Sequence, residues 1–341
     1  MEKVKRNIGV DLLRTVLILM IILHHTILRG PVSLRLLEEN KYNVQYTFFA
    51  FLNAFLVVAV NCFFLISGYF GIKKNFIKLL KLVIATYVIS GFLNILFVLL
   101  GIQQLEIDFL KSLVFPISQY WFVLVYLILF VIAPYLNVLL QNITIKEQRN
   151  LLVFLYLIWC GYAFLIDNPT IGANRGYSVG MAIVLYITGD YISKKRKEKS
   201  AGKLALLYIG FSGINGILCV ILLIFEKQNW VWKVYSYNNP LVVCGSIALF
   251  LVFCSLCYNF RYNIASLGKY TLYIYIVHST PVFASYYMNM YKRLSKGNVF
   301  ECLIESFILM LILYLIGLLI GVLYEIIWNL IETKFLKLPI V

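Results

Sequence analysis

Apolar runs alternate with short polar stretches along the whole chain. Most runs have about 17 to 25 residues, which is the length that crosses a bilayer as one helix. The last run is longer, so it has to tilt or extend into the cytoplasm. The pattern predicts an all-α, polytopic membrane protein with one integral-membrane domain over residues 1–341. We predict about ten transmembrane helices, near residues 9–28, 47–70, 77–100, 113–138, 151–166, 178–192, 204–225, 239–258, 269–290 and 302–330.

The distribution of Lys and Arg between these runs predicts their orientation. With the amino terminus placed inside, about twice as many basic residues fall on the inner side as on the outer side. The run KKRKEK at 194–199 is the strongest inner anchor. The first run contains Asp11 and Arg14, and no small-residue cleavage site follows it, so we expect a retained span and not a signal peptide. Both termini are therefore expected in the cytoplasm.

Composition agrees with a membrane protein. The chain is 62% hydrophobic and 13% charged, with a mean hydropathy of +0.88, whereas soluble domains are about 25% charged. The net charge of +15 lies in short loops, with no soluble basic module, so we expect the lipid bilayer and not nucleic acid as a partner. The CxxC pair Cys254 and Cys257 has no second pair and no nearby His, so we expect no metal site.

The first span, DLLRTVLILMIILHH at 11–25, carries four ionisable residues, which are costly within a bilayer. Arg14 and His25 are eleven residues apart, so they share a helix face about 16 Å apart along the axis. Asp11 lies one turn before Arg14 and can pair with it, whereas His24 points about 100° away from His25. We predict an inward stripe of Asp11, Arg14 and His25. The positions expected to face lipid are Leu12, Val16, Leu19, Met20 and Leu23.

The second span ends in the phrase NCFFLISGYFGIKKN at 61–75. Ser67 is polar within this phrase, and Gly68 and Gly71 permit a close backbone approach or a kink. Lys73 and Lys74 then lie at the predicted cytoplasmic surface.

Two later phrases add polar and aromatic side chains. The phrase ISQYWFVLVYLILFVIAPYLN at 117–137 places Tyr120 and Trp121 at the outer end of the fourth span, as part of an aromatic belt or of a substrate wall. The phrase LGKYTLYIYIVHST at 267–280 places His278 midway through the ninth span.

These motifs together resemble the acyltransferase-3 family of bacterial integral-membrane O-acyltransferases, which includes polysaccharide O-acetyltransferase-like proteins. The opening phrase IGVDLLRTVLILMIILHH contains the Arg-x10-His spacing, and FFLISGYFGIKKN, QYWFV and LGKYTLYIYIVHS resemble later family phrases in the same order. The resemblance covers essentially the whole chain. Some members carry an extra extracytoplasmic hydrolase-like domain, which we expect this chain to lack.

The resemblance implies transfer of an acyl group, usually acetyl, from cytoplasmic acyl-CoA to a hydroxyl of a cell-surface polysaccharide or its lipid-linked precursor. Acetyl-CoA would be the donor substrate, no cofactor would be bound, and the chain would lie in the bacterial cytoplasmic membrane. His25 would be a general base or a transient acyl carrier, and Arg14, held by Asp11, would bind the CoA end. The further candidates are Lys73 and Lys74 for the CoA phosphates, Tyr120, Trp121 and His278 as oxyanion donors, and Ser67 in support.

Two other functions fit parts of the pattern. A polytopic secondary transporter or flippase of a polar substrate also buries ionisable residues, although no inverted repeat is evident in this sequence. A membrane sensor or assembly partner without catalysis would tolerate loss of His25. Three predicted outer loops, at 29–43, 167–178 and 226–239, carry Arg, Asn, Trp and Tyr, which can contact sugar rings and hydroxyls. Loops of any function carry such residues, so this composition does not identify the acceptor.

Overall fold

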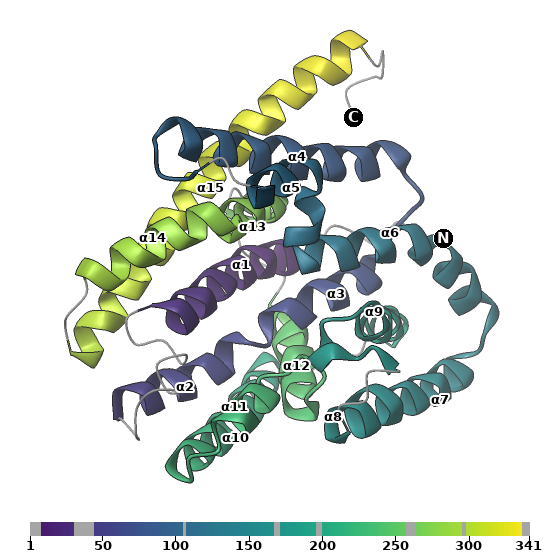
Figure 1. Cartoon of the computed structure of the whole chain (residues 1–341). Helices are drawn as coiled ribbons and strands as arrows, with labels where there is room; N and C mark the ends of the chain where they lie inside the picture. The colour runs from purple at the N-terminus through teal and green to yellow at the C-terminus, as the bar shows by residue number, and fades with distance from the viewer. Residues whose placement is uncertain are drawn as a thin grey trace.

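The computed structural model describes residues 8–30, 44–104, 107–166, 171–195, 200–256, 264–294 and 298–335, and every regular element in these ranges is helical (Figure 1). Seven helices among them are long and apolar enough to cross a membrane. The prediction of an all-α, polytopic membrane protein is therefore confirmed. The number of ten crossings and the cytoplasmic position of both termini stay predictions.

The helices follow the predicted apolar runs closely, with some divided into shorter pieces. The α-helices are α1 (Ile8–Arg29), α2 (Val44–Leu56), α3 (Ala59–Phe70), α4 (Phe76–Leu99), α5 (Ile107–Val114), α6 (Trp121–Asn142), α7 (Ile145–Tyr156), α8 (Ala163–Leu165), α9 (Val179–Lys194), α10 (Ala201–Ile224), α11 (Gln228–Val234), α12 (Pro240–Ser255), α13 (Thr271–Ser279), α14 (Pro281–Leu294) and α15 (Val299–Phe335). The shorter turns are η2 (Pro116–Gln119), η3 (Leu157–Tyr162, a π-helical turn), η5 (Asn174–Gly176) and η6 (Ile264–Tyr270).

Prolines interrupt two of the predicted spans. The predicted span 269–290 is broken between α13 and α14 at Pro281, because proline lacks the N–H that would continue the hydrogen-bond ladder. The predicted span 113–138 begins late, since Pro116 opens η2 and the long helix α6 starts only at Trp121. Both breaks lie next to predicted site residues.

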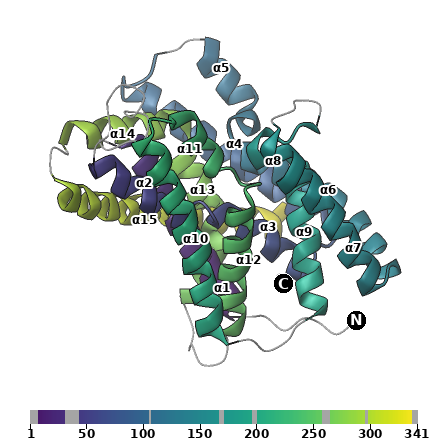
Figure 2. The ribbon, with the colours of Figure 1, turned by 90° about the horizontal axis from the view of Figure 1, so that it is seen from below.

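The first helix, α1, lies in the centre of the fold and not at its edge. It packs against η6, α15, α3 and α12, and Figures 1 and 2 show it surrounded by other helices. Neighbouring helices cover part of the side of α1 expected to face lipid, and the expectation is wrong for Leu23. Leu23 is buried, and Leu12, Val16, Leu19 and Met20 are half-buried. Because α1 is enclosed by protein, its ionisable side chains avoid direct exposure to hydrocarbon.

The tightest helix crossing joins α3 to α9. A Cβ atom added to Gly68 would lie 1.9 Å from the Tyr186 carbonyl oxygen, and one added to Gly189 would lie 2.2 Å from the Leu65 carbonyl oxygen. Only glycine allows two backbones to approach this closely. The predicted close approach at Gly68 is thus confirmed, and the positive φ of 70° at Gly71 ends α3.

A ring of three hydrogen bonds fixes the segment that follows α3. The Ile72 N–H donates to the Tyr186 hydroxyl (2.9 Å), this hydroxyl donates to Asn137 Oδ1 (2.7 Å), and Asn137 Nδ2 donates to the Ile72 carbonyl (2.8 Å). Since α6 and α9 supply the two side chains, these helices hold the backbone directly before Lys73 and Lys74.

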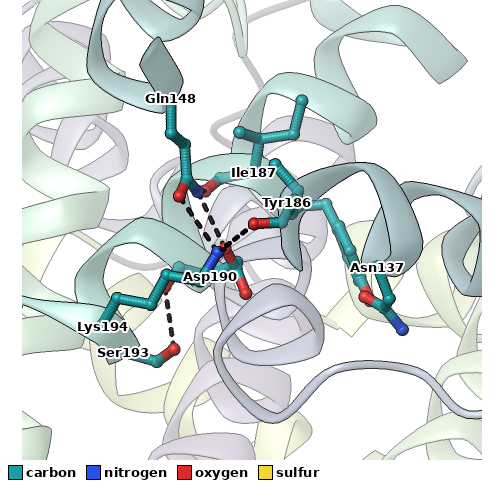
Figure 3. A network of polar contacts seen from close by, with 8 residues as sticks. Asn137, Gln148, Tyr186, Ile187, Asp190, Ser193 and Lys194 are labelled. Carbon is teal, nitrogen blue, oxygen red and sulfur yellow. Dashed lines mark hydrogen bonds and ion pairs between the residues drawn. The ribbon is translucent and has the colours of Figure 1, made fainter. Parts of the chain in front are cut away.

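A second polar network joins α7 to the end of α9 (Figure 3). The Gln148 amide nitrogen donates to Asp190 (2.8 Å), and Lys194 forms an ion pair with Asp190 (2.8 Å) and donates to the Gln148 amide oxygen (3.2 Å). Lys194 also donates to the Leu140 carbonyl at 2.7 Å. The network ties three helices together at the end of the fold predicted to be cytoplasmic.

Candidate active site

A cavity of about 330 Å³ runs along one face of α1. Arg14, Ile18, Ile21 and His25 line it at successive spacings of four, three and four residues, which is the spacing of a single helix face. Residues from α3, α6, α13 and η6 form the opposite walls. Arg14 and His25 therefore share one cavity, separated by roughly 16 Å along α1. Ligand pockets in proteins begin at about this volume, near 300 Å³.

Arg14 lies at the end of the cavity near the start of α1. Its Nη1 donates to Asp11 Oδ1 at 2.5 Å, and its guanidinium carbon lies 5.6 Å from the centre of the Phe70 ring. A Cβ added to Gly268 would lie 3.2 Å from Arg14 Cβ, so η6 packs closely over this side chain because it has glycine there. Lys269, the next residue, also lines the cavity. This end therefore combines two cations with one carboxylate.

His25 lies at the other end and contacts a second histidine. Its Nδ1 is 3.1 Å from His278 Nε2, and His278 Nδ1 is 2.8 Å from the Ile274 carbonyl oxygen. A carbonyl oxygen only accepts, so we assign a proton to His278 Nδ1. The neutral His278 ring then accepts through Nε2, and His25 donates from Nδ1. His25 Nε2 keeps its lone pair and can act as a base.

The position of His278 depends on the break between α13 and α14. His278 is fully buried and does not line the cavity, so it reaches the site only through His25. The Tyr287 hydroxyl of α14 donates to the His278 carbonyl at 2.9 Å, and the Ser279 hydroxyl lies 3.2 Å from His278 Nε2. The helix break thus supplies contacts that fix the second histidine.

His24 has a different environment from that of His25. It is 7% exposed, it does not line the cavity, and its Nδ1 is 2.6 Å from Asn53 Oδ1. The predicted rotation of about 100° away from His25 agrees with this placement. His24 is therefore a buried packing residue and provides a matched control for His25.

Aromatic side chains form one wall of the cavity. Trp121 stacks on Tyr237 with ring centres 5.5 Å apart and meets Tyr177 edge-on at 4.5 Å. Phe122 and Tyr126 continue the wall along α6, with ring centres 6.0 Å apart. A wall of this kind excludes water and offers flat faces to a sugar or an acyl chain.

The structure brings only some of the predicted site residues together. Arg14, His25, Ser67 and Trp121 line the cavity, and the ion pair of Asp11 with Arg14 is present. The Ser67 hydroxyl donates to the Phe63 carbonyl at 2.9 Å, as buried helix serines commonly do.

Besides Asp11 and His278, three other predicted residues do not line the cavity. Tyr120 is 1% exposed, and its hydroxyl is 2.8 Å from Thr280 Oγ1 in the wall of the bundle. Lys73 and Lys74 are exposed on the segment that follows α3, beyond the end of the cavity where Arg14 packs on Phe70. Their expected contact with phosphate can occur only outside the cavity.

Sequence reasoning missed five residues with polar side chains that line the cavity. They are Tyr126, Tyr237, Lys269, Thr271 and Tyr275. Lys269 lies within the phrase that contains His278. Tyr275 lies three residues before His278, so helix periodicity could have found it, whereas Tyr126 lies five residues after Trp121, about 140° around the helix, so periodicity from Trp121 does not point to it. Tyr237 comes from a loop, whose position no periodicity predicts.

The two ends of the cavity differ in chemistry. The Arg14 end carries guanidinium and ammonium groups, which bind anionic oxygens such as those of phosphates. The His25 end carries a base with a fixed tautomer, which can remove a proton from a hydroxyl. The cavity connects a site for an anion with a site for proton transfer.

Comparison with known proteins gives one match. The sequence model of a family described as an acyltransferase domain matches residues 7–326. No curated protein and no solved structure matches this chain. The matched region contains every residue that lines the cavity. The chain therefore belongs to the acyltransferase-3 family and is a membrane acyltransferase.

Proposed function

We propose that the protein is an O-acetyltransferase that moves an acetyl group from acetyl-CoA to a hydroxyl of a cell-surface polysaccharide or its lipid-linked precursor. It would act in the bacterial cytoplasmic membrane. The observation that carries this proposal is that Arg14 and His25 line one cavity from opposite ends. Family membership favours group transfer over the transporter and non-catalytic alternatives.

The donor enters from the Arg14 end, which the topology prediction places in the cytoplasm. Arg14 and Lys269 bind anionic oxygens of CoA, and Asp11 holds the guanidinium in place. Lys73 and Lys74 lie just beyond this end and contact the remaining phosphates. The pantetheine arm is an extended chain, and it places the thioester beside His25 when the phosphates lie at Arg14.

The acceptor hydroxyl enters from the His25 end. His25 Nε2 takes the hydroxyl proton, and the oxygen attacks the thioester carbonyl to form a tetrahedral intermediate. The protonated His25 ring donates from Nδ1 to His278 Nε2. This hydrogen bond is stronger from the charged ring than from the neutral ring, so it stabilises the imidazolium. The intermediate collapses as the carbon–sulfur bond breaks, and the thiolate receives the proton from His25. The products are the O-acetyl ester and free CoA.

Trp121 is the oxyanion donor that remains from the predicted set, since Tyr120 and His278 lie outside the cavity. Its indole N–H is a donor only, which suits a developing negative charge. Its position in the lining of the same cavity as His25 favours this role over that of a simple interface anchor.

The test uses cells that carry a deletion of the gene, complemented with variants. NMR of the surface polysaccharide should show acetyl esters with the parental protein and none with His25→Ala, while His24→Gln retains them. Comparable amounts of each variant in the membrane fraction provide the folding control. If the esters persist at the parental level with His25→Ala, the proposed base is wrong.

In purified protein, acid-quenched reactions with labelled acetyl-CoA separate a base from an acyl carrier. A general base leaves no label on the protein, whereas an acyl-histidine intermediate leaves label that His25→Ala abolishes. The proposal predicts the first result.

A further inference from the structure

A second, smaller cavity lies on the far side of the aromatic wall of the active site. It has a volume of about 130 Å³, and α11, η5 and α8 contribute to its lining. The residues that matter for its chemistry are Arg175, Asn229, Trp230, Lys233 and Asn238. Two of the predicted outer loops, 167–178 and 226–239, supply all five.

Positive charge dominates the lining of the small cavity. Arg175 and Lys233 both line it, and no acidic side chain does so among the described residues. Lys233 Nζ donates to the Leu165 carbonyl at 2.8 Å, which fixes the ammonium and uses one of its three protons. An ammonium beside a guanidinium favours a ligand that carries an anionic group.

A broad aromatic face adjoins these cations. Trp230 is 55% exposed, and its ring centre lies 5.0 Å from Lys233 Nζ. The apolar face of a sugar ring packs on an aromatic ring of this kind while its hydroxyls remain free for hydrogen bonds.

A buried amide in the cavity wall has an unused acceptor. Asn238 is 1% exposed, and its Nδ2 donates to the Trp159 carbonyl of the π-helical turn η3 at 2.9 Å. That contact fixes the amide orientation, and Oδ1 has no hydrogen-bond partner. A buried polar oxygen without a partner is costly, so this part of the cavity wall has an unsatisfied acceptor.

Three consecutive residues lie between the small cavity and the active-site cavity. Ser236 and Asn238 line the small cavity, whereas Tyr237 between them lines the active-site cavity and stacks on Trp121. The Tyr237 N–H donates to the Arg175 carbonyl at 2.9 Å. Arg175 has a φ of 53°, so its backbone is held in a conformation that non-glycine residues rarely adopt. The two cavities therefore share one rigid wall.

We propose that the small cavity binds a sugar unit bearing an anionic group, and that this unit belongs to the acceptor whose neighbouring hydroxyl reaches His25. The inference rests on the proposed function for the identity of the acceptor. Binding itself depends only on the small cavity. Trp230 supplies the platform, and Arg175 and Lys233 hold the anionic group.

The test is saturation-transfer NMR on the purified full chain with three probes: glucuronate, glucose 6-phosphate and glucose. We expect transfer to at least one anionic sugar and about tenfold weaker binding of glucose, a difference of roughly 1.4 kcal/mol. The two anionic probes distinguish a carboxylate from a phosphate. Absence of transfer to both anionic probes, or equal binding of glucose, would overturn the proposal.

Variants of the lining residues test whether the anionic sugar binds in the small cavity. Trp230→Ala and Lys233→Gln should each weaken the binding of the anionic sugar by about tenfold, whereas Trp230→Phe should keep most of the affinity. Lys227→Gln is the matched control, because this exposed lysine lies on the same loop but does not line the cavity. Unchanged binding in both Trp230→Ala and Lys233→Gln would contradict the assignment and leave these residues as interface anchors.

The same measurement on His25→Ala separates this proposal from the proposed function. The variant should bind the anionic sugar as the parental chain does, since His25 does not line the small cavity. Loss of acetyl transfer in His25→Ala tests the active site, and sugar binding tests only the small cavity. Loss of sugar binding in His25→Ala would contradict the claim that the small cavity binds the sugar independently of the active site.

Discussion

The active-site cavity and the network of Gln148, Asp190 and Lys194 are both polar clusters inside a largely apolar fold, but they are built differently. In the network, each charge meets an opposite charge or an amide, and Lys194 also binds a backbone carbonyl. In the cavity, His25 uses one ring nitrogen for His278 and retains the other as a base. Arg14 has five N–H donors, of which Asp11 occupies one Nη1 contact, and its side chain is 31% exposed.

The difference separates polar groups that join helices from polar groups that can act on a ligand. Polar groups whose donors and acceptors are paired with one another stabilise a fold and have few hydrogen bonds left for a substrate. A base with a fixed tautomer and a partly paired cation, both facing a cavity, retain that capacity. Substitutions in the two clusters should therefore have opposite effects on activity and stability.

After the complete loss expected from His25→Ala, the largest effect is expected from Arg14→Ala. Removing the guanidinium should lower kcat/KM for acetyl-CoA by about 100-fold or more, because charge-assisted contacts to an anionic donor are lost. Initial rates of CoA thiol release measure this change. Arg149→Ala removes an exposed arginine of α7 and should leave the rates unchanged. Parental kinetics in the Arg14 variant would assign this residue to an ion pair alone.

His278→Ala should have the next largest effect. Without His278, the His25 ring loses the contact that fixes its tautomer, and such second contacts contribute roughly 10–100-fold in activity. The loss should appear in kcat, with little change in KM for acetyl-CoA. His278→Gln should recover part of the rate, because its amide oxygen can accept from His25 Nδ1. A rise in KM with unchanged kcat would contradict a positioning role.

A smaller effect is expected from the exposed lysines at the predicted cytoplasmic end. The double change Lys73→Gln and Lys74→Gln should raise KM for acetyl-CoA severalfold while kcat is retained, since both lie outside the cavity. The matched control is Lys146→Gln with Lys203→Gln, two exposed lysines on the same predicted side. An unchanged KM would leave Lys73 and Lys74 with a role in topology only.

The smallest effect on activity is expected from Asp190→Asn in the polar network. The change removes the ion pair with Lys194, which is part-exposed, and should cost about 1 kcal/mol of stability. The melting temperature should fall by a few degrees, and kcat and KM per folded molecule should stay at the parental values. A specific loss of kcat with unchanged melting would mean that the network takes part in the chemistry.

The sequence predicted the helical fold and one face of the site for a clear physical reason. A spacing of eleven residues fixes Arg14 and His25 on one side of α1, whatever surrounds that helix. The position of α1 at the centre could not be predicted, because a run of apolar residues packs equally well against lipid and against protein. Contacts that cross the chain, such as His25 with His278 and Trp121 with Tyr237, depend on packing between distant helices.

The central claim is that donor and acceptor meet in the cavity beside α1, and a complex with a non-hydrolysable acetyl-CoA analogue tests it most directly. A structure of that complex, determined by electron cryomicroscopy, should place the phosphates at Arg14 and Lys269 and the acetyl group next to His25 Nε2. An analogue bound outside this cavity, or with its acetyl group at the Arg14 end, would contradict the account.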